Sequence, residues 1–171
     1  MSIMKSILTT TAVALSLASP LVASAQSTGT LAKIAKSGEI VIGHRESSVP
    51  FAYLDENQKP VGYSMDLCMK VVEAVSKEVG KEVTVKYVPV NPKTRIALMA
   101  NGTIDLECGS TTNNLTRQQQ VEYLPVTFVT GTKIMARKGS GIASVKDLDG
   151  KAVALAQGTT NERAVKAAIK D

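Results

Sequence analysis

The sequence contains few of the residues that enzymes most often use for catalysis. Its 171 residues include one histidine, His44, two cysteines and no tryptophan. A Ser-His-Asp site would depend on His44, and the "CGSTT" segment lacks the G-x-S-x-G pattern of a nucleophile elbow. One histidine and two distant cysteines do not form a metal site, and "GSTTNN" lacks the lysine of a phosphate-binding loop. We therefore expect a protein that is not an enzyme and uses no metal or cofactor, with His44 in a structural role.

The sequence also has few aromatic residues and no run of one charge. Aromatic residues make up 4% of the chain, which leaves little for base stacking, and 20 basic residues are scattered among 15 acidic ones. The formal net charge is +5. These features argue against nucleic acid as a partner and are compatible with a small anionic ligand.

Residues 1–25 have the pattern of a signal peptide. Lys5 precedes the apolar run "ILTTTAVALSLA", and "ASA" at residues 23–25 has the small-x-small form of a cleavage site. The apolar run is short for a transmembrane helix, so a membrane anchor is the weaker alternative. We expect export, cleavage near Ala25 and no membrane insertion after cleavage.

The hydrophobic pattern predicts alternating strands and helices. Strands are expected over residues 39–45, 82–90, 103–108, 126–139 and 151–156, and helices over residues 30–38, 64–80, 92–102, 115–124 and 161–170. A hairpin-like excursion is expected over residues 47–63, and a short helix or turn over residues 144–150. In the second helix Ser64 is the expected N-cap, and the expected buried face consists of Leu67, Val71, Val72, Val75 and Val79. The order predicts an α/β fold with a parallel or mixed sheet flanked by helices.

Glycines predict a boundary between two units. Gly131 and the glycines at 139 and 141 separate residues 30–131 from a second unit over residues 132–171. A unit of about 35 residues cannot enclose a core of its own. We expect the sequence to be part of a longer protein, and to bind a ligand weakly or not at all by itself.

The two cysteines leave two interpretations open. In an oxidising compartment Cys68 and Cys108 can form a disulfide, which would stabilise the fold by about 4 kcal/mol in the chain-entropy model. The alternative is a pair of buried thiols.

Arginine and hydroxyl side chains follow the predicted strands, at the edge where α/β sheets bind ligands. Arg45 follows the first strand, Ser110 and Thr112 follow the third, and Arg117 lies in the first turn of the next predicted helix. The segment "QGTTN", which contains Thr160, repeats this arrangement in the second unit. Hydroxyl groups, a helix N-terminus and a guanidinium group together suit a carboxylate ligand.

Each of these residues also has a plainer interpretation. Thr112 or Asn114 can be an ordinary helix cap, and Arg45 and Arg95 can be ordinary surface residues. The prediction of a site therefore depends on the recurrence of the pattern and not on any single residue.

Four segments carry a resemblance to a known family: "GHRESSVPFAYLD", "PVGYSMDLCMKVVEAV", "NGTIDLECGSTTNN" and "LDGKAVALAQGTTNE". They resemble the periplasmic amino-acid-binding proteins of ABC importers, solute-binding protein family 3. "GHRESSVPF" and "ECGSTTNN" resemble the glutamate/aspartate-binding branch. The resemblance implies the two-lobed periplasmic-binding-protein type II fold, a periplasmic location, a monomer, and the membrane subunits of an ABC importer as partners.

The resemblance also implies two sets of ligand-binding residues for L-glutamate or L-aspartate. The set for the α-carboxylate is Arg117, Thr112 and Thr160. The set for the side-chain carboxylate is Arg45, Arg95 and Ser110. Two departures affect this assignment. Pro92 stands where the branch usually has a serine, and the acidic residue that binds the ligand ammonium group in the family lies beyond Asp171.

Three alternatives accompany this interpretation. The ligand can be another polar amino acid. Exported dehydratases of cyclic amino acids share the fold, and Glu46 or Glu107 would then be the acid/base candidates. A sensor domain of the same fold would require a transmembrane segment further along the chain.

Overall fold

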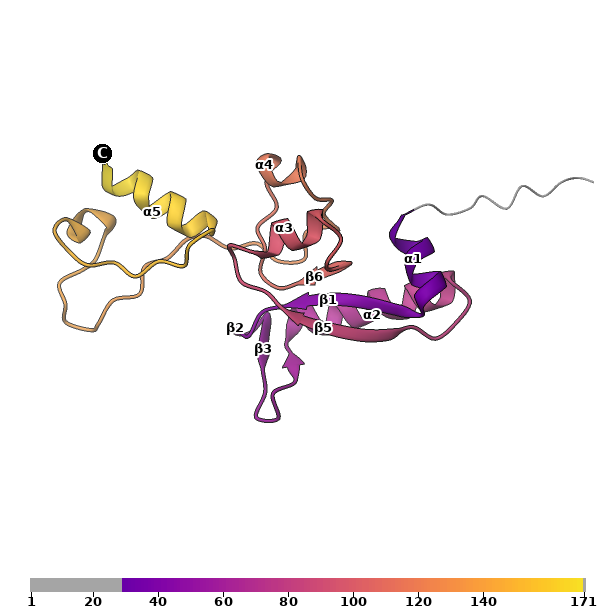
Figure 1. Cartoon of the computed structure of the whole chain (residues 1–171). Coiled ribbons are helices and arrows are strands. Elements are labelled where there is room, and N and C mark those ends of the chain that lie inside the picture. Colours follow the sequence, from indigo (N-terminus) through magenta and orange to yellow (C-terminus); the bar gives the residue numbers. More distant parts are fainter. Residues whose placement is uncertain (1–28, 171) are drawn as a thin grey trace, which may run out of the picture.

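A three-stranded parallel sheet lies at the centre of residues 29–170, which are the part of the chain that this computed structural model describes. The strand order is β5 (Thr84–Pro89), β1 (Glu39–His44), β6 (Leu106–Cys108), so β1 is the central strand (Figure 1). This confirms the predicted α/β class with a parallel sheet. The expected signal peptide lies outside the described residues.

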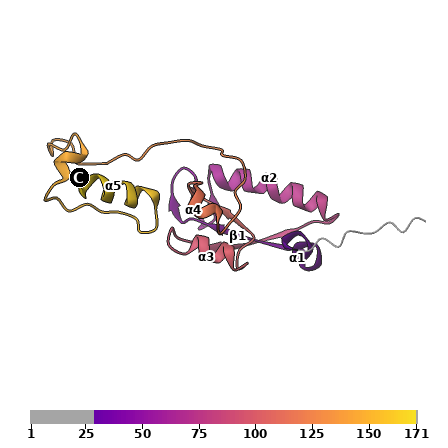
Figure 2. The ribbon, with the colours of Figure 1, turned by 90° about the horizontal axis from the view of Figure 1, so that it is seen from above.

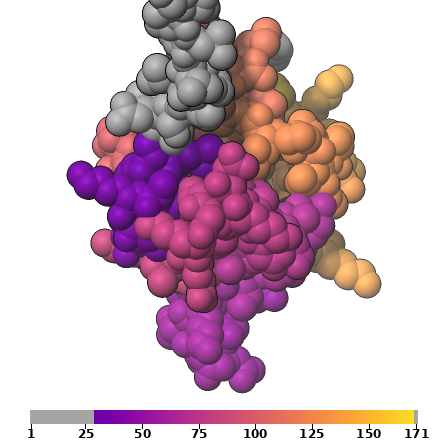
Figure 3. Space-filling view, turned by 90° about the vertical axis from the view of Figure 1, so that its right-hand side faces the viewer, coloured from indigo at the N-terminus to yellow at the C-terminus, as the bar shows by residue number. Residues whose placement is uncertain are grey.

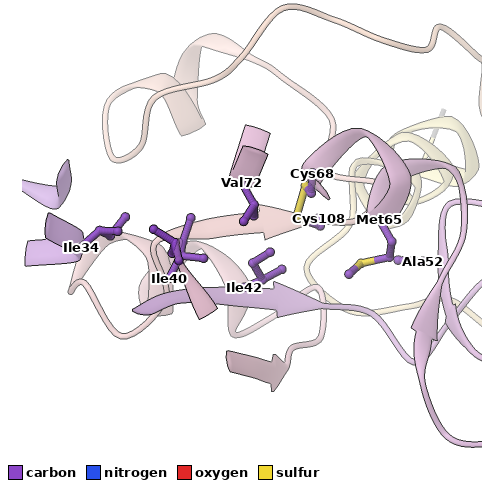
Figure 4. Packing of buried hydrophobic residues seen from close by; sticks show 9 residues of the cluster. Ile34, Ile40, Ile42, Ala52, Met65, Cys68, Val72 and Cys108 are labelled. Carbon is purple, nitrogen blue, oxygen red and sulfur yellow. A yellow bond between two sulfur atoms is a disulfide. The ribbon is translucent and has the colours of Figure 1, made fainter. Parts of the chain in front are cut away.

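Helices cover both faces of β1 because successive side chains of a buried strand point to opposite faces. Ile40 and Ile42 pack with residues of α1 (Thr30–Ser37) and α2 (Tyr63–Glu78). Val41 packs on the other face, against the region of α3 (Arg95–Ala100). Figure 2 shows α2 and α3 on opposite sides of β1, and Figure 4 shows the side chains of the larger cluster.

Helix α2 differs from the prediction at its start and on its buried face. Gly62 is the N-cap, and the Ser64 hydroxyl instead donates to the carbonyl oxygen of Gly109 at 2.7 Å. The buried residues are Met65, Cys68 and Val72, whereas the side chain of Leu67 is 37% exposed. The prediction is confirmed for Val72, which is buried, and for Val75 and Val79, which pack against the same cluster, and it is wrong for Leu67. Contacts with β1 and β6 decide which side of the helix is inward, and they also bury Met65 and Cys68.

The excursion between β1 and α2 forms a small antiparallel sheet. Its strands are β2 (Ser47–Ser48), β3 (Ala52–Leu54) and β4 (Pro60–Val61), in that order. Figure 3 shows the corresponding atoms projecting from one end of the molecule. The predicted hairpin-like excursion is confirmed, and its base places residues 48–51 beside the carboxyl end of the parallel sheet.

Gly62 connects this excursion to α2 in a conformation that only glycine adopts readily. Its φ is 121°, and a Cβ atom at this position would lie 2.7 Å from the carbonyl oxygens of both Pro50 and Phe51. We expect Gly62→Ala to lower the free energy of unfolding by about 3 kcal/mol, measured by urea denaturation. Gly80→Ala is the matched control, since Gly80 has a φ of 70° and no atom near its missing Cβ. The control should lose about 1 kcal/mol, and an equal loss in both variants would contradict the argument.

The later elements are shorter than predicted. Helix α4 spans Leu115–Gln118, four residues, whereas the prediction gave residues 115–124. The predictions of strands over residues 126–139 and 151–156 are wrong, because both segments are irregular in the structure. A strand is held by hydrogen bonds to a neighbouring strand, and neither segment pairs with one among the described residues. The β-branched residues of these segments favour an extended backbone locally, but no neighbouring strand among the described residues pairs with them.

Residues 132–170 contain two short elements, the 3-10 helix η1 (Val145–Leu148) and helix α5 (Thr160–Lys170), which contact each other. Both agree with the predictions for residues 144–150 and 161–170. The residues of the two hydrophobic clusters all lie between positions 34 and 108. Among residues 29–170, no helix is both long enough and apolar enough to cross a bilayer.

Candidate functional site

Arg117 joins two parts of the chain that are distant in sequence. Its side chain is 8% exposed, and its guanidinium donates from Nη1 to the carbonyl oxygen of Thr112 at 2.7 Å and from Nη2 to that of Gly158 at 3.1 Å. Thr112 follows β6, and Gly158 precedes α5. Arg117 therefore lies where the segment after β6 meets the segment before α5.

The predicted anion site at the N-terminus of a long helix is not supported. Helix α4 has a single turn, and the side chain of Asn114 caps it by accepting from the backbone N–H of Arg117 at 3.0 Å. A helix this short has too few aligned peptide dipoles to attract an anion strongly. Of the two cap candidates, Thr112 and Asn114, the structure uses Asn114.

Arg95 and Glu107 form a buried pair of opposite charges. Arg95 begins α3 and is 3% exposed, and its Nη1 atom lies 3.8 Å from Oε1 of Glu107 on β6. The prediction that Arg95 is a ligand-site residue ignored this carboxylate. The other carboxylate oxygen, Oε2, accepts from the Thr111 hydroxyl at 2.7 Å.

The electrostatic environment of this pair includes two further arginines. Burial lowers the pKa of Arg95, and the positive charges of Arg117 and Arg45 lower it further, whereas Glu107 opposes the shift. Burial raises the pKa of the Glu107 carboxyl, against the effect of the Thr111 hydrogen bond and of the arginines. Three guanidinium groups therefore act on one buried carboxylate. We refer to Arg45, Arg95, Arg117 and Glu107 as the arginine cluster.

Gly109 allows Arg45 to approach Glu107. A Cβ atom at Gly109 would collide with Oε1 of Glu107 and would lie 3.0 Å from Cγ of Arg45. The carboxylate and the stem of Arg45 thus both pack on the Gly109 backbone. Arg45 follows the end of β1 and is half-buried.

A hollow of about 370 Å³ lies beside this cluster, and six of the ten residues that line it are serines or threonines. The predicted residues Ser110, Thr112 and Thr160 line it, with Phe51 and Thr132 among their neighbours. The hydroxyl oxygens of Thr112 and Thr160 are 3.1 Å apart, although 48 positions separate these residues. The arginines of the cluster are not among the residues that line the hollow.

Phe51, which the sequence analysis did not select, lines the hollow and contacts two further aromatic residues. Phe51 makes an edge-on contact with Phe128 at 4.9 Å between ring centroids and with Tyr63 at 6.2 Å. The Tyr63 hydroxyl donates to the carbonyl oxygen of Thr127 at 3.0 Å. These contacts attach the irregular segment after α4 to the excursion. The "VPFAY" segment was the available signal, since it places an aromatic residue just after the first strand.

Pro92 lies at the contact between the two parts of the chain. A Cβ atom at Gly158, whose φ is 81°, would lie 2.8 Å from the carbonyl oxygen of Pro92. The backbone before α5 thus packs directly on the turn before α3, and glycine is needed at position 158 for this approach.

The cysteines and the histidine have structural positions near the site. Cys68 on α2 and Cys108 at the end of β6 are joined by a disulfide (Figure 4). His44 is buried at the end of β1, where its Nδ1 atom is 3.2 Å from the carbonyl oxygen of Arg45 and its ring contacts Tyr87 edge-on. Within residues 29–170, no three His, Cys, Asp or Glu side chains form a group that could hold a metal ion.

The six predicted site residues thus form two adjacent groups. Arg45, Arg95 and Arg117 belong to the arginine cluster, and Ser110, Thr112 and Thr160 line the hollow. The hydrogen bond from Arg117 to Thr112 connects the groups. Guanidinium groups bind carboxylates through paired hydrogen bonds, and hydroxyl groups add further donors. The arrangement suits a small ligand with more than one carboxylate.

Comparison with known proteins is consistent with this chemistry. The family model of bacterial extracellular solute-binding proteins, family 3, matches residues 40–171. A glutamate/aspartate import solute-binding protein of Salmonella typhimurium is 54% identical over 78% of this chain and 44% of its own length. An L-glutamate/L-aspartate-binding protein of Pseudomonas aeruginosa is 49% identical over 100% of this chain and 57% of its own length. The chain therefore spans about half the length of the curated relatives it matches.

Solved structures support the fold independently. An ancestral amino acid-binding protein, a precursor of cyclohexadienyl dehydratase, superimposes with a TM-score of 0.70 and is 29% identical, over 83% of this chain and 62% of its own. An ancestral arginine-binding protein bound to glutamine gives a TM-score of 0.67 at 32% identity, over 78% of this chain and 57% of its own. The predicted two-lobed binding-protein fold class is confirmed by these similarities.

Proposed function

Because the chain belongs to family 3 of the bacterial extracellular solute-binding proteins, we propose that it captures an acidic amino acid, L-glutamate or L-aspartate, for delivery to an ABC importer. The proposed location is the periplasm, after cleavage of a signal peptide near Ala25. The partners are the membrane subunits of the importer, and the protein acts as a monomer.

The arginine cluster is the observation that carries this proposal. Arg45, Arg95 and Arg117 act on one buried spot beside a hollow, and within residues 29–170 Glu107 is the carboxylate paired with this cluster. An excess of buried positive charge is costly without an anion. A ligand with two carboxylates supplies that charge, whereas a neutral amino acid has only one. The names of the relatives from Salmonella typhimurium and Pseudomonas aeruginosa support the same ligand class.

The proposed ligand contacts follow the two groups of site residues. Arg117 binds the α-carboxylate, with the hydroxyl groups of Thr112 and Thr160 as further donors. Arg45 and Arg95 bind the side-chain carboxylate, with Ser110 beside them. The contact of 3.1 Å between the hydroxyl oxygens of Thr112 and Thr160 supports a ligand position between the two parts of the chain. Closure about a hinge near residues 129–133 completes the proposal.

Isothermal titration calorimetry tests the ligand class. The protein that carries this chain should bind glutamate or aspartate at least about 100-fold more tightly than glutamine, because a neutral side chain leaves buried guanidinium donors unpaired. Histidine and arginine serve as basic comparison ligands. Tightest binding of glutamine, histidine or arginine would contradict the proposed acidic ligand.

A further inference from the structure

Glu107 holds a position that the proposed ligand contacts do not explain. It lies on β6 opposite Gly43 of the central strand, and its side chain is 13% exposed. The carboxylate lies among the three guanidinium groups that are proposed to bind an anionic ligand. A carboxylate there competes with such a ligand for the same positive charges, so its presence requires an explanation.

The contact between Glu107 and Arg95 supplies charge compensation without a hydrogen bond. Oε1 of Glu107 is 3.8 Å from Nη1 of Arg95, which is close enough for an ionic attraction and too long for a hydrogen bond. Among the described protein atoms, Nε and Nη1 of Arg95 and Oε1 of Glu107 find no hydrogen-bond partner. Buried polar atoms of this kind are normally paired. The Nε and Nη1 donors of Arg95 are therefore not used by the described protein atoms.

Two neighbours fix the carboxylate in this position. The Thr111 hydroxyl donates to Oε2 at 2.7 Å, which holds one oxygen away from Arg95. The backbone of Gly109 packs against Oε1 and would be displaced by any side chain at that position. The separation of Glu107 from Arg95 thus follows from local packing.

We propose that Glu107 is a positioning residue that compensates the charge of Arg95 before a ligand binds and leaves its hydrogen-bond donors free for the ligand side-chain carboxylate. This inference rests on the proposed function. Glu107 offsets the cost of an uncompensated buried charge on Arg95 in the ligand-free protein. In return it repels the incoming carboxylate, so it moderates the affinity for acidic amino acids.

The main test is the Glu107→Gln variant, titrated with glutamate and with glutamine near pH 8. Removing the repulsion should raise the ratio of glutamate to glutamine affinity by about fivefold or more, because only glutamate places a second carboxylate near Arg95. Glu78→Gln is the matched control, since it removes the charge of an exposed glutamate at the end of α2, outside the arginine cluster. The control should change the ratio by less than about twofold.

A dependence on pH provides a readout that a merely structural role would not affect. Since burial raises the pKa of Glu107, its carboxyl gains a proton at a higher pH than an ordinary glutamate does. The wild-type ratio of glutamate to glutamine affinity should therefore rise as the pH is lowered from about 8, and the ratio of the Glu107→Gln variant should stay constant. The charged groups that act on Glu107 are Arg95, Arg45 and Arg117. Tyr123, whose pKa is raised by burial, stays neutral.

Stability measurements keep the proposal testable if Glu107→Gln does not fold. Removing one member of a buried ion pair leaves the other uncompensated, whereas removing both restores balance. The double variant Arg95→Gln/Glu107→Gln should therefore melt at a higher temperature than Arg95→Gln alone. A lower melting temperature of the double variant would overturn the pairing.

The two proposals fail in different ways. If the wild-type protein does not prefer glutamate or aspartate to glutamine, the proposed function is wrong, whatever Glu107 does. If it has this preference and Glu107→Gln leaves the affinity ratio unchanged or lowers it, the assignment of Glu107 is wrong and the proposed function stands. Both proposals are supported if Glu107→Gln has a higher ratio of glutamate to glutamine affinity than the wild-type protein and if this difference disappears at low pH.

Discussion

Replacing Arg117 with methionine is expected to lower the affinity for glutamate by at least about 100-fold, because a paired contact between a guanidinium group and a carboxylate is lost. Arg117→Lys should recover little of this, since an ammonium group cannot form two parallel hydrogen bonds. The loss should apply equally to glutamate and glutamine, because both have the α-carboxylate that Arg117 is proposed to bind. Titration calorimetry with both ligands measures it.

The same substitution affects the fold in a separable way. Methionine at position 117 leaves the carbonyl oxygens of Thr112 and Gly158 without this donor, which should lower the free energy of unfolding by about 1–3 kcal/mol. Arg137→Met is the matched control, since Arg137 is exposed in the irregular segment after α4. Circular dichroism should confirm that both variants are folded before titration. Binding by Arg117→Met within about threefold of wild type would refute the assigned role.

Loss of the disulfide is expected to have the largest effect on stability. The bond between Cys68 and Cys108 closes a loop of 40 residues, and in the chain-entropy model it stabilises the fold by about 4 kcal/mol. Cys68→Ala/Cys108→Ala should therefore unfold at a markedly lower urea concentration than the oxidised wild-type protein. The bond ties α2 to the end of β6, the strand that also carries Glu107.

Reduction of the wild-type protein distinguishes the contribution of the disulfide bond to stability from the contribution of side-chain packing by the two cysteines. Both cysteines are buried, so the alanine variant also loses some packing. The wild-type protein in a strong reductant keeps both sulfur atoms and should lose most of the same stability. Identical urea midpoints for oxidised and reduced wild-type protein would contradict a stabilising disulfide.

Predictions from the sequence were correct for elements that depend on local residue patterns. The β-branched run at residues 39–45 and the glycine at 38 gave the central strand and the end of α1. Prediction failed at residues 126–139 and 151–156, where the same kind of signal produced no strand, because a strand also requires a neighbour. It failed again at α4, where the segment "LTRQQQVEYL" suggested ten helical residues and the structure has four.

In the candidate site, too, some features could be predicted from the sequence and others could not. Its residue types and their recurrence after strands were visible in the sequence, as were Arg117 and the two threonines at 112 and 160. The partners of these residues were not visible. Nothing in the sequence indicated that Arg117 donates to two carbonyl oxygens 46 positions apart, those of Thr112 and Gly158.

The sequence by itself determined the α/β order of elements, the set of arginines and hydroxyl residues, and the two cysteines available for a bridge. These features depend on periodicity and on residue type within short segments, which can be recognised without knowledge of the fold. Only the tertiary structure decided which groups meet: Thr112 with Thr160, Gly158 with Pro92, and Glu107 with Arg95. These pairings arise from packing between distant segments, and burial then sets the charge balance of the site.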